Sequence, residues 1–389
     1  MLLETERVIT LAKRRHFRQH KKTNFAQAKK IDFQIENIDG LGQGVSKPHN
    51  EVHFIAKTLP GETGTARVLK QKKNVSIARL DTLDIASEQR VEPSCAHFAQ
   101  CPGCHFLHTD YSTELELKKS VLVNSFRKIE LPQGGIDVSR APQRQHYRNR
   151  LQLHYRHKYL GMVDGLMDQV VEIPECQILI PQLQAHLHAL YEDKSWTEEH
   201  SGDGHCEIYW QDDRVNINWD KPYADGGFTQ VNQAVNEMLI DQVKQRALAV
   251  PFEHLLDVFS GTGNLSNPII AEKHVPRRMV DLSNVSHADF MAMNLYDEDA
   301  LPRFLQRQGL KQFDLMLVDP PRKGFPALND WVKRLKPKRL IYVSCNPASL
   351  AADVRSLTGK FTLAHLSLLD MFPSTYHFET VATLDFPKH

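Results

Sequence analysis

Cys345 and Glu379 are the residues whose types and setting could carry covalent chemistry. The apolar run 340–344 predicts a buried strand, and Cys345 follows it directly. Glu379 comes thirty-four residues later, beside His377 and several aromatic residues. A cysteine at a strand end can also be inert core. A thiolate and a carboxylate in one pocket, however, suit covalent chemistry on a pyrimidine ring.

That chemistry would give each of the two groups its own step. Carbon 5 of uracil is a poor nucleophile until a thiolate adds to carbon 6. Cys345 suits this addition, after which carbon 5 can take a methyl group from a sulfonium donor. Glu379 suits the removal of the carbon 5 proton, which lets the thiol leave. Because the thiolate is the reactive form, we expect a lowered pKa for Cys345.

A glycine-rich turn between two expected strands indicates a nucleotide-type ligand. In "LLDVFSGTGNLS" the strand 254–259 runs into Gly261 and Gly263, and a helix-like run follows. Glycine lets the backbone approach a ligand closely. Asp281 ends the next strand, eighteen residues beyond Gly263, where an acid can bind ribose hydroxyls. Because a full G-x-G-x-x-G is missing, the pattern favours an adenosine ligand over a dinucleotide.

A third strand end carries Asp319, followed by two prolines and Arg322. Ligands of open α/β sheets bind beyond the carboxyl ends of the strands, so Asp319 is a further binding candidate. A proline-rich stop after a strand is the plainer alternative. Enzymes that methylate amino groups usually have an aromatic residue after such prolines, so Arg322 argues against that reaction.

Four cysteines are spaced as metal ligands. Cys95, Cys101 and Cys104 form C-x5-C-x2-C, and Cys176 lies far downstream. Six cysteines in 389 residues are too few for a disulfide scaffold, and surface thiols without a ligand fit the tight spacing poorly. Four thiolates suit either a [4Fe–4S] cluster or structural zinc, and the spacing does not decide between them.

The first two segments of the chain differ in character. Strand-like runs at 31–35 and 52–56, with glycines 40, 42 and 44 as turns, predict a small basic β-barrel of the oligonucleotide-binding kind or a plain hairpin subdomain. The part that follows is mixed and contains an expected helix at 113–128. Its run "YRNRLQLHYRHKYLGMV" suits either an RNA-facing sheet or an ordinary amphipathic one.

The last segment predicts the fold class. After an expected helix at 230–249, helix and strand alternate, and the strands are short apolar runs. This pattern predicts an α/β protein with a doubly wound parallel sheet. The expected buried strands are 254–259, 278–281, 315–319 and 340–344.

Composition and charge limit the class of protein, its location and its binding partners. Apolar residues make up 41% of the chain, which is ordinary for a globular protein. Because no run approaches the roughly 18 apolar residues of a membrane span and no secretory signal is present, we expect a soluble, cytoplasmic protein without a membrane partner. Net charge is only +1, but residues 1–30 are strongly basic, which indicates either a phosphate-binding arm or a solvated tail.

Taken together, these motifs resemble the RNA uracil-5 methyltransferases. From about residue 31 to the C-terminus, "GLGQGV", "CAHFAQCPGCHFLHTDY", "FTQVN", "DVFSGTGN", "DPPRKG", "SCNPASLAADV" and "DMFPSTYHFETV" follow in family order. The cysteine segment is similar to that of the 23S rRNA branch, which has an iron–sulfur cluster. The resemblance implies a basic arm (1–30), a TRAM-like RNA-binding barrel (31–85), a central iron–sulfur and RNA-binding domain (86–225) and a class I methyltransferase domain (226–389).

The resemblance also implies roles for individual residues. Cys345 would be the nucleophile and Glu379 the base. S-adenosyl-L-methionine would be the methyl donor, and a [4Fe–4S] cluster would be structural or would position RNA. The implied donor-binding residues are Gln230, Phe259, Asn264, Asp281, Asn294 and Asp319, and the implied cluster ligands are Cys95, Cys101, Cys104 and Cys176.

The sequence departs from the family after Asp281. Only thirteen residues reach from there to Asn294, too few for a normal helix plus strand, so we expect a more open donor pocket on that side. The substrate would be RNA, and 23S rRNA is favoured over tRNA by the cysteines. A non-catalytic RNA-binding protein and a zinc-stabilised methyltransferase of another base, such as cytosine, are the alternatives. We expect a monomer without an obligate protein partner.

Overall fold

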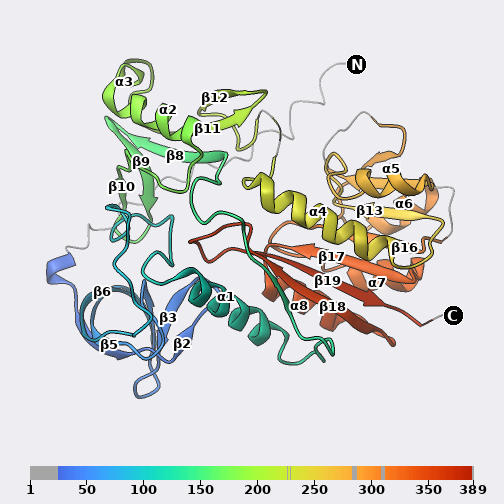
Figure 1. Ribbon diagram of the computed structural model, residues 1–389, viewed down its shortest axis with the longest axis horizontal. Coiled ribbons are helices and arrows are strands. Elements are labelled where there is room, and N and C mark those ends of the chain that lie inside the picture. Colours follow the sequence, from blue (N-terminus) through green and yellow to red (C-terminus); the bar gives the residue numbers. More distant parts are fainter. Residues whose placement is uncertain (1–24, 226, 228, 283–286, 308–311, 388–389) are drawn as a thin grey trace.

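The computed structural model describes residues 25–225, 227, 229–282, 287–307 and 312–387, so most of the basic arm lies outside it. The described residues form three sheets, which sit at separate corners of the molecule (Figure 1). Strand order is β1-β5-β6-β4-β3-β2 in the first sheet, β10-β9-β8-β11-β12 in the second and β15-β14-β13-β16-β17-β19-β18-β7 in the third.

The first sheet is curved and follows a 3-10 turn at Phe25–Gln27. Its strands are β1 (Lys30–Gln34), β2 (Asn37–Ile38), β3 (Gln43–Ser46), β4 (Val52–Ala56), β5 (Thr63–Lys72) and β6 (Val75–Ile85). One expectation was wrong: Gly44 lies within β3 rather than in a turn. A Cβ atom there would come 2.1 Å from Thr58 Oγ1, so close packing rather than chain reversal requires glycine.

The second sheet is antiparallel throughout, and one of its faces is covered by helices. The basic, aromatic run at 147–163 supplies two of its strands. Its elements are β8 (Arg150–Arg156), β9 (Tyr159–Asp164), β10 (Gln169–Val171), α2 (Pro181–Glu192), α3 (Trp196–Glu199), β11 (Asp203–Gln211) and β12 (Arg214–Trp219).

The third sheet confirms the predicted doubly wound α/β class. Five neighbouring strands, from β15 to β17, are parallel, whereas β19 runs antiparallel between β17 and β18. Its elements are α4 (Gln233–Leu248), β13 (Leu255–Val258), α5 (Asn267–Lys273), β14 (Arg277–Asp281), β15 (Phe290–Ala292), α6 (Ala300–Arg307), β16 (Leu315–Val318), α7 (Leu328–Leu335), β17 (Arg339–Ser344), α8 (Pro347–Ser356), β18 (Thr362–Leu369) and β19 (Glu379–Asp385).

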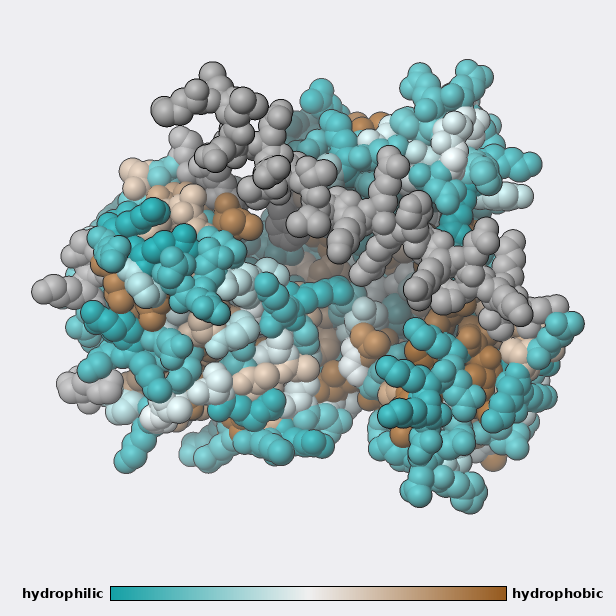
Figure 2. Space-filling view, turned by 180° about the vertical axis from the view of Figure 1, so that it is seen from behind, coloured by the Kyte–Doolittle hydropathy of each residue, from teal (hydrophilic) through white to brown (hydrophobic). Residues whose placement is uncertain are grey.

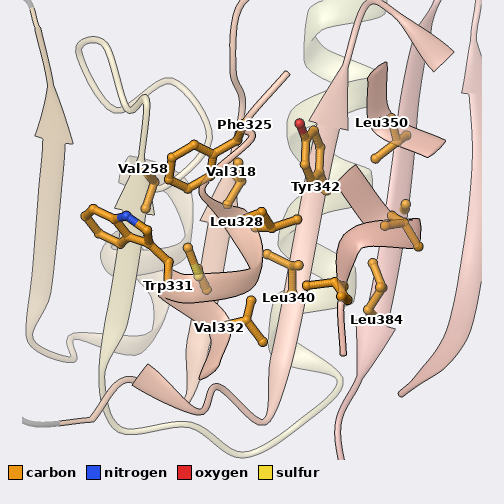
Figure 3. Packing of buried hydrophobic residues seen from close by; sticks show 14 of the residues in the cluster. Val258, Val318, Phe325, Leu328, Trp331, Val332, Leu340, Tyr342, Leu350 and Leu384 are labelled. Atoms are coloured by element: carbon orange, nitrogen blue, oxygen red, sulfur yellow. The ribbon is translucent and has the colours of Figure 1, made fainter. Parts of the chain in front are cut away.

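Successive apolar side chains of the central strands point to opposite faces of this sheet, so helices cover both faces. Leu340 and Tyr342 of β17 pack with α7 and α8, whereas Ile341 and Val343 pack with α4. On the first of these faces Trp331 of α7 lies against Phe325, with ring centroids 5.7 Å apart (Figure 3). Central strands buried on both faces read as unbroken apolar runs, which is why the sequence located them closely.

Two elements from the middle of the chain also belong to the third sheet. Strand β7 (Asp137–Ser139) pairs in parallel with the outer edge of β18, and helix α1 (Tyr111–Phe126) packs against α8. Leu122 and Phe126 of α1 are fully buried in the same core as the central strands. The segment 86–225 therefore completes the sheet that the C-terminal segment begins.

Capping residues set where the two expected long helices begin. The Asp110 carboxylate accepts a hydrogen bond from the Thr113 amide (2.9 Å), which starts α1 at Tyr111, two residues before the predicted start. Asn232 likewise accepts from the Val235 amide, so α4 begins at Gln233 and Gln230 is left in the preceding loop.

The face drawn in Figure 2 is mostly hydrophilic and is hollowed near its middle. Among the described residues, no helix combines the length and the apolar character that a bilayer crossing would require.

Candidate active site and cysteine cluster

One large cleft brings together the chemistry-bearing residues that the sequence indicates. Its volume is about 1930 Å³, and both the second and the third sheets contribute to its walls. It is lined by Gln230, Phe259, Asn264, Asp281, Asn294, Asp319, Cys345 and Glu379, together with Cys101, Cys104 and Cys176. Cys95 lines a small adjoining cavity with these three cysteines.

Strand pairing places Cys345 beside Glu379. Cys345 directly follows β17, and Glu379 is the first residue of β19. Because the two strands are antiparallel, with Ser344 opposite Thr380, the end of one and the start of the other meet at the same edge. This is also the carboxyl edge of the parallel strands, where open α/β sheets bind their ligands.

The expected low pKa of Cys345 is wrong for the protein without ligands. Its pKa is raised to about 11: burial is the largest cause, the nearby acids Glu379 and Asp319 add to the rise, and the Arg322 guanidinium opposes it. Burial and Asp319 also raise the pKa of Glu379 well above its usual range. These shifts favour the protonated form of both groups, and Arg322 is the cation that favours the thiolate of Cys345.

Replacing Arg322 by glutamine should raise the pKa of Cys345 further, because the guanidinium that favours the thiolate is lost. A group with a raised pKa becomes thiolate only as pH rises, so the thiolate fraction at a fixed pH should fall on the order of tenfold. Ultraviolet thiolate absorbance against pH, taken as the difference from Cys345→Ala, measures this. Lys323→Gln is the control, since Lys323 lies over Tyr296 instead. An unchanged titration in Arg322→Gln would contradict the assignment.

The glycine turn is fixed to the acid of the next strand. The Gly261 amide donates to Asp281 Oδ2 at 2.9 Å, and the turn begins with Phe259 in the left-handed region, at a φ of 62°. Phe259 packs edge-on against Phe325. The side-chain amides of Asn264 and of Asn236, in the first turn of α4, donate hydrogen bonds to each other's oxygens. These contacts fix the position of the glycine turn beside the cleft.

Asn294 reaches the cleft although the connection from Asp281 is short. A three-residue strand, β15, does form and pairs in parallel with β14, and the Met293 amide donates to the Asp281 carbonyl at 2.7 Å. Residues 283–286 lie outside the described part of the chain. Of the helix and strand that the family usually has here, a strand of three residues is therefore present.

Acids gather beneath the glycine turn. Burial raises the pKa of Asp257 to about 7, and burial together with Asp257 and Asp281 raises that of Asp319 to about 7. Close carboxyl groups that resist losing their protons favour a cationic ligand, because a positive charge nearby would stabilise all of them in the charged form.

The four spaced cysteines share one neighbourhood. Burial raises the pKa of Cys104 well above the ordinary value, and Cys176, Cys101 and Cys95 add to the rise. Lys57 Nζ donates to the carbonyl oxygens of Phe98 and Cys101 in the same loop. In the described ranges, no group of three or more His, Cys, Asp or Glu side chains is placed to hold a metal ion.

Sequence reasoning missed several residues of this region. Arg322 was read only as a sign against amino-group methylation, yet its Nη2 lies 3.0 Å from His377 Nε2 and its charge acts on Cys345. Tyr296 lines the cleft and lies beside Phe259, with ring centroids 5.5 Å apart. Lys57 lies 44 residues before the cysteine whose carbonyl it binds, and no motif marks it.

The glycine turn, the acid after the next strand and the reversed strand β19 define an S-adenosylmethionine-dependent methyltransferase of the Rossmann-like class. The family model described as tRNA (Uracil-5-)-methyltransferase matches residues 303–385. Two curated relatives, from Shewanella frigidimarina and Shewanella halifaxensis, are both named 23S rRNA (uracil(1939)-C(5))-methyltransferase RlmD. The first is 27% identical over 92% of this chain and 96% of its own length, and the second 29% identical over 95% and 98%.

A solved structure has the same fold. It is the Pyrococcus abyssi tRNA (uracil-54, C5)-methyltransferase in complex with S-adenosyl-L-homocysteine, which matches with a TM-score of 0.68 and 21% identity over 91% of this chain and all of that one. Over nearly its whole length the chain is similar to RNA uracil-5 methyltransferases.

Proposed function

We propose that this protein transfers a methyl group from S-adenosylmethionine to carbon 5 of a uridine in RNA, with Cys345 as nucleophile and Glu379 as base. The observation that carries the proposal is the meeting of Cys345 and Glu379 at one sheet edge, in the cleft that also contains the glycine turn. Thiol, carboxyl group and donor-binding loop are the three parts that the chemistry needs.

The donor would occupy the part of the cleft next to the glycine turn. Asp281 would accept the ribose hydroxyls, with Phe259, Asn264 and Asn294 around the adenosine. Gln230 and Asp319 would lie toward the reacting atoms. The donor's sulfonium charge, placed near Asp319, offsets the acids that hold the pKa of Cys345 high. Donor binding would thus favour the thiolate form of Cys345.

Arg322 and Glu379 would act on different protons, that of the Cys345 thiol and that of carbon 5. The Arg322 guanidinium would stabilise the thiolate of Cys345 before it adds to carbon 6. Glu379 is buried, and burial and Asp319 raise its pKa, so it is a stronger base once ionised than an exposed carboxylate. After methyl transfer it would take the proton from carbon 5 and release the thiol.

The cysteines would hold a [4Fe–4S] cluster. Cys95, Cys101, Cys104 and Cys176 line one small cavity, and the other three thiols add to the raised pKa of Cys104, so four thiolates there need a cationic centre. A cluster of several irons accepts one thiolate per iron and therefore tolerates thiols that do not converge on a single ion. This favours the cluster over zinc. The cluster would be structural, since methyl transfer needs no redox step.

The substrate would be 23S rRNA. The curated relatives that match nearly the whole chain carry that substrate in their names. The curved sheet of residues 31–85 and the second sheet, in the segment 86–225, would bind RNA beside the methyltransferase segment 226–389. The same chemistry on tRNA is the second candidate, favoured by the tRNA enzyme of the same fold.

Mass mapping of modified nucleosides in rRNA and tRNA from a deletion strain tests the proposal. Loss of one 5-methyluridine in 23S rRNA, restored by the intact gene, is the expected result. Loss of a 5-methyluridine in tRNA instead would show that tRNA is the substrate. If no 5-methyluridine is lost and purified protein does not bind S-adenosylhomocysteine, the chain is a non-catalytic RNA-binding scaffold.

A further inference from the structure

The loop between β18 and β19 (residues 370–378, the β18–β19 loop) carries the residues that lead to Glu379. It must turn sharply, because β18 and β19 are adjacent antiparallel strands. Ser374 is fully buried in it and has a φ of 67°, a left-handed conformation that non-glycine residues seldom adopt. Such a conformation persists only where the surroundings impose it.

A buried group of charges imposes the position of this loop. The group consists of Glu114, Lys118, Arg144 and Asp370, and three of these four are at most 1% exposed. Lys118 Nζ donates to Asp370 Oδ1 at 2.6 Å and to Glu114 Oε1 at 2.7 Å. Two cations face two carboxylates, so the charges balance within the group.

The charge group is joined to the backbone of the loop. Glu114 Oε1 accepts from the Ser374 amide at 2.7 Å, and Lys118 Nζ donates to the Phe372 carbonyl at 3.2 Å. Tyr111, on the same face of α1, donates its hydroxyl to Asp370 Oδ2 at 2.8 Å. One face of α1 thereby hydrogen-bonds the β18–β19 loop at Asp370, Phe372 and Ser374.

The same contacts reach the cysteine loop (residues 95–106). The Ser374 carbonyl accepts from the amides of His105, at 2.7 Å, and Phe106, at 3.1 Å. Arg144 donates to Glu114 and also to the Phe106 carbonyl, at 2.7 Å. Ser374 is thus held on its amide side by α1 and on its carbonyl side by the residues that directly follow Cys104.

We propose that Lys118 and Glu114 are positioning residues for the methyl-transfer site: they fix the β18–β19 loop, and through Ser374 the cysteine loop, so that Glu379 and His377 are held beside Cys345. This inference rests on the proposed function. Buried ion pairs seldom stabilise a fold more than apolar side chains of the same size, but in some proteins they specify one arrangement of the chain, and that is the role assigned to this charge group. Burial opposes the charge of Lys118, yet Asp370 and Glu114 together hold its pKa above the ordinary value.

Lys118→Met tests the proposal, because methionine keeps the length of the side chain and removes the charge. Hydrogen exchange at the Ser374 and Thr375 amides and steady-state kinetics per folded molecule are the readouts, at a temperature where circular dichroism shows full folding. We expect faster exchange at these amides and a fall in kcat on the order of 100-fold, with KM for RNA and affinity for S-adenosylhomocysteine unchanged. Tyr111→Phe, which removes only one hydroxyl, should show a smaller change in the same direction.

Arg339→Met is the matched control. Arg339 and Asp385 form a two-point ion pair, at 2.6 and 2.7 Å, at the opposite ends of the same two strands, β17 and β19. Its loss should lower thermal stability and leave kcat per folded molecule and Ser374 exchange unchanged.

If Lys118→Met and Tyr111→Phe keep the wild-type kcat per folded molecule and a protected Ser374 amide, the proposal is overturned. If Lys118→Met does not fold, the outcome for Tyr111→Phe decides in the same way. Failure of the proposed function would appear differently, as wild-type protein that methylates no uridine, and the exchange comparison would still be measured.

Discussion

Cys345→Ala should transfer no methyl group, and Glu379→Gln should remain joined to the RNA. Without the thiol nothing adds to carbon 6, so carbon 5 never becomes nucleophilic. Glutamine keeps the thiol and the donor pocket but cannot remove the carbon 5 proton, so turnover should fall about 100- to 10,000-fold while the adduct persists. A denaturing gel of labelled RNA with S-adenosylmethionine should show a slow band for Glu379→Gln and none for Cys345→Ala.

Cys206→Ala is the control for this experiment. Cys206 is fully buried in β11, in the second sheet, and should leave both turnover and the gel pattern unchanged. Methylation by Cys345→Ala, or an adduct formed without that thiol, would refute the assigned mechanism.

Protein purified without oxygen should be brown and contain about four irons per chain. Cys101→Ser and Cys104→Ser should lose the iron and lower Tm by roughly 5–10 °C, because the cysteine loop would lose its link to Cys176. Iron analysis, visible absorbance and thermal melting measure this, and Cys206→Ala should keep the iron. Colourless protein with one zinc per chain would instead show a zinc site.

The sequence was sufficient where local patterns determine position. Cys345 and Glu379 could be placed together because strand ends of an α/β sheet meet at one edge, and the strand before Cys345 is an unbroken apolar run. Asp281 could be found because a parallel strand begins soon after the glycine turn. Helix starts were displaced by two or three residues because the capping side chains, Asp110 and Asn232, decide them.

The sequence failed where the effect depends on neighbours in space. The pKa of Cys345 follows from burial and from three charged groups that come from other parts of the chain. The sequence could therefore suggest a reactive thiolate but not the raised pKa that opposes its formation. Lys118 and Asp370 are 252 residues apart; Asp370 opens the motif "DMFPSTYHFETV", but no pattern in the sequence marks Lys118 as its partner. Arg79 likewise pairs with Asp164 across two sheets without any local signal.

Strand β7 and helix α1 have a consequence for the newborn chain. Strand β18, the partner of β7, is synthesised about 230 residues later, a wait of about 10–50 s at translation rates of about 5–20 residues per second. During that time the apolar side chains of Leu122, Phe126 and Val138 lack the core that later covers them. A chain cut short before residue 347, where α8 begins, would therefore have an uncovered face on α1 and an unpaired β7, both of which favour aggregation.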